Sequence, residues 1–144
     1  MMNRKRLIRA AALMLAFAPT IAMTSDAPSL KEIMQGLRND LVEISDGLLM
    51  GDFEQVARGA IAISEHPQIP EAQIQLVAEE LGAEMAAFKQ FDTRVHDLSL
   101  DIHAAAKAHD HRTAVSAFQR LTDGCFACHD TYKERVASVL KDTG

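Results

Sequence analysis

The stretch Gly124-Cys125-Phe126-Ala127-Cys128-His129, near the end of this 144-residue chain, decides what the other residues must build. Cys-x-x-Cys-His is the pattern to which haem is attached covalently. The two thiols add to the two vinyl groups of haem, and the neighbouring imidazole reaches the iron as its proximal ligand. In a helix these three side chains share one face, because residues three and four apart are neighbours. No other cysteine is present, so we expect one haem c on Cys125, Cys128 and His129.

Three other interpretations of the cysteine pair stay open at this stage. A dithiol redox pair usually begins a helix that follows a strand, and no alternation of strands and helices is visible. A zinc site that used His129 would need a fourth ligand. A structural disulfide is disfavoured, because cysteines three apart on a helix seldom reach disulfide geometry.

Residues 1–22 have the pattern of a secretory signal peptide. Basic residues at positions 3–9 precede an apolar run over 10–18, and Thr20-Ile21-Ala22 offers the small residues that a signal peptidase reads. An uncleaved membrane anchor is the alternative, although Pro19 ends the apolar run before it could span a bilayer. Cleavage would leave residues 23–144 as one domain. Haem is attached to exported apoproteins outside the bacterial cytoplasm, so the expected location is the periplasm, with no membrane segment in the mature form.

The expected mature domain is strongly acidic. It holds eleven Lys and Arg residues against twenty Asp and Glu residues, a net charge near −9. Such a surface does not favour nucleic acid. It suits transient association with a basic redox partner through electrostatic steering, although the charge can also serve solubility alone. The sequence has no nucleophile–base grouping and no phosphate-binding glycine loop, so an enzyme is not predicted.

Apolar residues recur at spacings of three and four, which predicts four amphipathic helices and no strands. The first helix begins with a capping box, in which Ser29 is the N-cap and Glu32 stands three residues later. The third would be about 55 Å long, and Gly82 offers a place for a bend or break. Short connections favour an antiparallel up-down four-helix bundle with its cofactor in the core. The expected helices run from the Ser29 cap to Gly51, from the Asp52 cap to His66, from Glu71 to about Lys107, and from the Asp110 cap through Val139.

With these features the chain resembles the class II cytochromes c, the cytochrome c′ family. Class I cytochromes c carry the haem motif near the N-terminus, whereas here it lies near the C-terminus, within the last expected helix. The resemblance covers essentially the whole mature chain, and it implies a monohaem electron carrier that can pair as a homodimer through its first two helices. Where the family often has Arg after the tyrosine, this chain has Lys133. The matching segments are Phe88-Lys89-Gln90, Ala117-Phe118 and Cys125-x-Ala127-Cys128-His129-Asp130-x-Tyr132.

The sixth ligand of the iron separates two functions within this family. In its low-spin members a methionine early in the first helix is the distal ligand, and in its gas-binding members that place holds a non-ligating apolar residue. Met34 lies in the second turn of the first helix, and antiparallel packing would bring it level with His129. We therefore expect Met34 as distal ligand and electron transfer as the function. Met85 is the second candidate, and a five-coordinate iron that binds NO or CO is the alternative.

Overall fold

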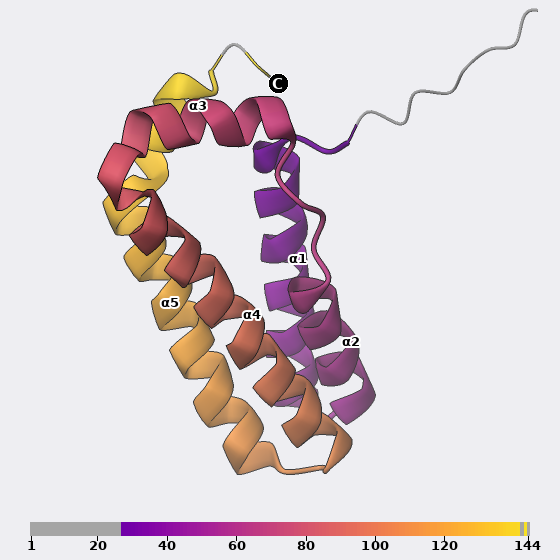
Figure 1. Cartoon of the computed structure of the whole chain (residues 1–144). Coiled ribbons are helices and arrows are strands. Elements are labelled where there is room, and N and C mark those ends of the chain that lie inside the picture. Colours follow the sequence, from indigo (N-terminus) through magenta and orange to yellow (C-terminus); the bar gives the residue numbers. More distant parts are fainter. Residues whose placement is uncertain (1–26, 142, 144) are drawn as a thin grey trace, which may run out of the picture.

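The computed structural model describes residues 27–141 and 143, so the expected signal peptide over residues 1–22 lies outside the described part of the chain. Over the described residues all regular structure is helical, which confirms the prediction of an all-α helical bundle (Figure 1). None of the described helices is long and apolar enough to cross a membrane. The elements are α1 (Leu30–Met50), α2 (Phe53–Ser64), α3 (Glu71–Leu81), the short 3₁₀ turn η1 (Gly82–Glu84), α4 (Met85–Lys107) and α5 (His111–Val139).

Short polar side chains begin three of the helices, as the sequence predicts. At α1 the Ser29 hydroxyl accepts the Glu32 N–H at 3.3 Å, and the Glu32 carboxylate accepts the Ser29 N–H at 2.8 Å. Asp52 and Asp110 each accept the N–H of the third residue after them. The first N–H groups of a helix have no partner within it, so each cap fixes where its helix starts.

The helix expected over residues 71–107, with a possible bend or break at Gly82, is divided into α3 and α4. The chain breaks at Gly82, the position that the sequence offered for a break, where φ is +50°. Glycine adopts a backbone conformation with positive φ at little energetic cost, because it has no Cβ. The turn η1 then redirects the chain, so that α3 lies across one end of the bundle instead of extending α4 (Figure 1). The spacing of apolar residues continues unchanged from α3 into α4, because both helices pack apolar side chains against the core. The periodicity of the sequence therefore does not show that the helix breaks.

Helices α1 and α2 form one tightly packed antiparallel pair. A Cβ added at Gly47 of α1 would lie 2.9 Å from the backbone nitrogen of Val56 on α2. Further along, a Cβ added at Gly59 of α2 would lie 2.8 Å from the carbonyl oxygen of Asp40 and 2.9 Å from Cγ1 of Ile44. The two backbones approach this closely only because both positions lack a side chain.

Helices α4 and α5 form the second antiparallel pair. Near the middle of the pair, a Cβ added at Gly124 would meet Cγ2 of Val95 at 3.7 Å. Further toward the α3 end, the Tyr132 ring stands edge-on to those of Phe88 and Phe91, with centroids 5.6 and 6.0 Å apart. The two pairs join along α2 and α4, whereas α1 and α5 meet at few points. The α1–α5 seam is therefore the least closed side of the bundle.

The apolar core is divided into two clusters. The base cluster fills the end of the bundle away from α3. The α3 cluster fills the other end, where α3 covers the first turn of α1, the start of α4 and the later part of α5. The buried members of the base cluster are Ile44, Leu48, Val56, Ala57, Ala60, Ile63, Leu98, Ile102, Ala105, Ala106, Ala114, Ala117 and Leu121, and those of the α3 cluster are Leu30, Val77, Leu81, Tyr132 and Val136.

Candidate functional site

The two cysteines lie on α5 where one core cluster gives way to the other. Both are free thiols and both are half-buried. Cys125 packs against the base cluster, and Cys128 packs against the α3 cluster. Gly124, just before them, is buried and faces Val95 of α4. The pair therefore spans the boundary between the two halves of the core.

The other motif residues lie nearer the surface. His129 is exposed and lines a surface hollow of α5 together with Lys133 and the ring of Phe126, which is 65% exposed. The three side chains expected on one face therefore differ in burial. The two thiols are half-buried toward the interior, and the imidazole of His129 lies at the exposed edge of the same face. His129 is free to turn toward a group placed beside α5.

The electrostatics of the thiols bear on the alternative functions. Burial, together with the neighbouring Cys125 and Asp92, raises the pKa of Cys128 to about 11, and burial also raises the pKa of Cys125. A dithiol redox pair needs the opposite, because its attacking cysteine works as a thiolate at neutral pH. Over residues 27–141 and 143, no group of three His, Cys, Asp or Glu side chains is arranged to hold a metal ion.

Helical geometry places Met34 and His129 on the same side of the bundle. His129 follows Gly124, which faces α4, by five residues and so lies about 140° further around α5. Met34 lies about 140° around α1 from Gly47, which faces α2. Helices α1 and α5 run antiparallel, so the same rotation has opposite senses on the two helices when both are viewed from one end of the bundle. Met34, turned away from α2, and His129, turned away from α4, therefore both lie toward the α1–α5 seam. Met34 remains 40% exposed there, since little of α5 covers it.

Met34 also lies at the level of the cysteines. Leu30 of α1 belongs to the α3 cluster with Tyr132, and Leu37 packs against the base cluster. Met34 stands between them, one turn or about 6 Å beyond Leu30. On α1, Met34 therefore lies at the boundary between the base cluster and the α3 cluster, as the cysteine pair does on α5. Met85 is half-buried in the α3 cluster, further from this level.

These residues fit a haem. The apolar core is divided into two clusters, and the side chains near their boundary include two thiols on α5 and the thioether of Met34 on α1. A flat apolar group at this level would join the clusters and cover Met34. Cys125, Cys128, His129 and Met34 are the residues that would hold it.

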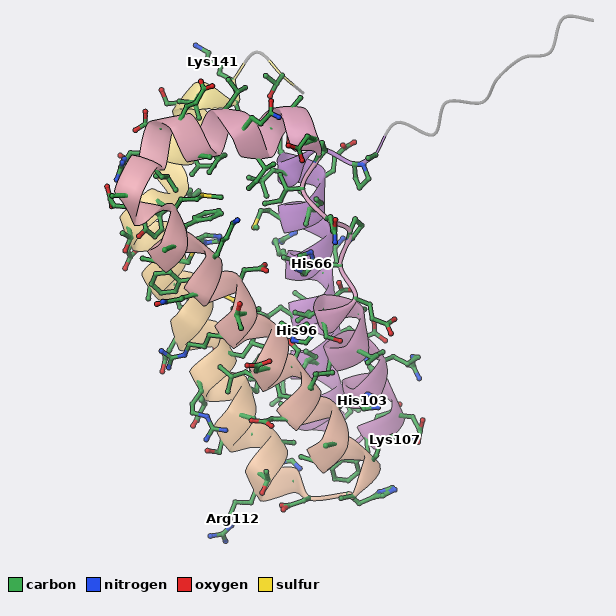
Figure 2. The ribbon with its side chains drawn as sticks, viewed as in Figure 1. His66, His96, His103, Lys107, Arg112 and Lys141 are labelled. Carbon is green, nitrogen blue, oxygen red and sulfur yellow. The ribbon has the colours of Figure 1, made fainter. Side chains whose placement is uncertain are left out.

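Two histidines of α4, His96 and His103, have polar partners within the bundle. Nδ1 of His96 lies 3.2 Å from Oδ1 of Asp97, and Nδ1 of His103 lies 3.0 Å from the carbonyl oxygen of Ala57. Figure 2 shows the two rings in succession along the α2–α4 side of the bundle. They act there as links within and between helices.

Sequence reasoning did not find the long-range polar contacts around the site. Nε2 of His66, which follows α2, lies 3.2 Å from Oδ1 of Asp92 on α4. Gln73 of α3 is 6% exposed and bonds to the first residue of α1. Arg135 of α5 binds Glu80 at the other end of α3 and Glu84 in the adjoining turn η1. No local sequence pattern marks these pairs, because their partners lie far along the chain.

Searches of protein-family models, of curated proteins and of solved structures found no significant match to this chain. The functional argument therefore depends on the residues of the site and on their arrangement.

Proposed function

We propose that the protein is a monohaem c-type cytochrome that carries single electrons. Cys125 and Cys128 would anchor the haem, His129 would be its proximal ligand and Met34 its distal ligand. The observation that carries this proposal is the position of the cysteine pair at the boundary of the two core clusters, level with a methionine on the least closed seam. When bound, the haem supplies an iron that changes oxidation state by one electron.

The residues of the chain have distinct tasks in this proposal. Cys125 and Cys128 would each hold the haem through one thioether bond. The high thiol pKa values keep both cysteines neutral before attachment. The imidazole of His129 and the thioether of Met34 would both bind the iron, a ligand pair that suits electron transfer and leaves no place for a gas ligand. Tyr132, packed edge-on against two phenylalanines, would shield one side of the site from water.

Location and partner follow from the same proposal. A covalently bound haem requires export of the chain, so the signal peptide and the periplasm belong with it. The described residues carry more acidic than basic side chains, which favours a basic redox partner that binds transiently. A homodimer through α1 and α2 remains part of the proposal by resemblance to cytochrome c′.

Mass spectrometry and absorption spectroscopy of the exported protein test this function. A haem adduct on the peptide with Cys125 and Cys128 is expected, and its absence would refute the proposal. The reduced protein should show sharp α and β bands, which mark a six-coordinate iron. Met34→Ala should replace them with a broad high-spin spectrum, whereas Met85→Ala should leave them unchanged. A high-spin spectrum in the unmodified protein would instead favour the gas-binding function.

A further inference from the structure

We infer that Gln73 of α3 is a positioning residue that holds Met34 at the iron by fixing the first turn of α1. This inference rests on the proposed function, because it concerns the distal ligand of that site. Gln73 lies on neither helix that carries a ligand, so its effect on the iron would act through α1.

Gln73 is one of two buried polar or charged residues in the described part of the chain, and its hydrogen bonds join three segments. Its Oε1 accepts the N–H of Leu30 at 2.7 Å, and its Nε2 lies 3.3 Å from both the carbonyl oxygen and the hydroxyl of Thr143. Leu30 is the first residue of α1, where N–H groups have no partner within the helix. Because Leu30 is only 6% exposed, water cannot freely replace the amide oxygen.

The cap at Ser29 determines where α1 begins but not where its first turn lies relative to the rest of the molecule. Direct packing against α5 is sparse, since α1 and α5 meet at few points. The first turn of α1 is also joined to α3, through the Gln73 bond and through the apolar cluster that Leu30 shares with Val77 and Leu81. Figure 1 shows α3 reaching across from the start of α1 to the later part of α5.

The opposite end of α3 is joined to α5. Nε of Arg135 lies 3.1 Å from Oε1 of Glu80, and its Nη1 lies 3.0 Å from Oε1 of Glu84 in the adjoining turn η1. Helix α3 has 11 residues, a length of about 16 Å. It therefore links the helix that carries Met34 to the helix that carries His129, with Gln73 and Arg135 near its two ends.

The consequence for Met34 is direct, because it follows Leu30 by one helical turn. Loss of the Gln73 side chain would leave the Leu30 N–H without its acceptor and would free the first turn of α1 from α3. Exchange between bound and released Met34 should then shift toward release by about tenfold, the size expected for one buried hydrogen bond. An added ligand that competes with Met34 should bind more tightly by the same factor.

Imidazole is the probe, titrated into the ferric holoprotein and followed by absorption. Gln73→Leu should lower the Kd for imidazole about tenfold. Gln75→Leu is the matched control, because Gln75 lies on the same helix but bonds only to exposed Glu71; its Kd should stay unchanged. Gln73→Glu keeps an acceptor for Leu30 at a helix N-terminus, where a carboxylate is favoured, and should restore a Kd close to that of the unmodified protein.

A double-mutant cycle separates positioning from general loosening. In a Met34→Ala background, Gln73→Leu should no longer change the Kd for imidazole, because no methionine remains to compete. An equal effect in both backgrounds, or no effect in the unmodified background, would overturn the inference. If the unmodified protein binds imidazole as tightly as Met34→Ala does, Met34 is not a ligand of the iron. That result would refute the ligand set given under the proposed function, before the role of Gln73 is tested. Amide exchange of the holoprotein should also show faster exchange at Leu30 in Gln73→Leu, and unchanged exchange there would count against the inference.

Discussion

Replacement of Gly59 by alanine should destabilise the protein, although alanine is the better helix former. The added Cβ would lie 2.8 Å from the carbonyl oxygen of Asp40, 2.9 Å from Cγ1 of Ile44 and 3.1 Å from the Ile44 nitrogen. Two of these atoms belong to the α1 backbone, so no side-chain rotation relieves the contact. The helices must therefore move apart.

The magnitude follows from two opposing terms. Overpacking of a close interface costs about 1–3 kcal/mol. The gain from replacing glycine within a helix is about 1 kcal/mol. Helices that separate by about 0.5 Å also lose about a quarter of their contact energy at the affected atoms. We expect a net loss of about 1–2 kcal/mol and a Tm lower by about 5 °C.

Gly36→Ala provides the matched control, because a Cβ at Gly36 meets nothing within 4 Å. It should stabilise α1 by about 0.5–1 kcal/mol, through helix propensity alone. Guanidinium unfolding of the holoproteins, followed by circular dichroism, compares the two. If Gly59→Ala were as stable as Gly36→Ala, the close approach of α1 and α2 described above would be refuted.

Two further predictions concern the α5 side of the site. The pKa of Cys128 is raised to about 11. In the haem-free protein, its thiol should therefore react slowly with iodoacetamide at pH 9 and faster as the pH approaches 11, which peptide mass spectrometry can measure. Between pH 9 and 11 the Cys128 thiol keeps its proton in the folded state and loses it in the unfolded state, so the free energy of unfolding should fall as the pH rises from about 9 to 11. If Cys128→Ser showed the same dependence of stability on pH, this prediction would be contradicted. Tyr132→Ala should cost about 3–5 kcal/mol by opening a cavity beside Phe88 and Phe91. Tyr132→Phe keeps the ring and should lose far less, so equal guanidinium midpoints for the two variants would refute this packing.

Local sequence signals predicted the parts of the fold that depend on neighbouring residues. The capping residues Ser29, Asp52 and Asp110 begin their helices as expected, because a cap bonds within three residues of itself. Apolar spacing predicted the helical class for the same reason.

The remaining features depend on contacts between distant segments. The break at Gly82 depends on where α3 can pack, and the apolar rhythm is the same on both sides of it. Met34 belongs to the apolar pattern of the first helix, yet it is 40% exposed, because the seam between α1 and α5 is only partly closed. The bond from Gln73 to Leu30 spans 43 residues, and no periodic pattern encodes it.

The division of the core has a consequence for motion. Each half of the molecule buries its own apolar side chains, so the end with α3 can open while the base cluster stays folded. Transient release of an axial methionine would then need only a sub-global fluctuation of the α3 end. The midpoint of global unfolding and the lifetime of the distal bond would be set by different halves of one short chain, so selection could change either without the other.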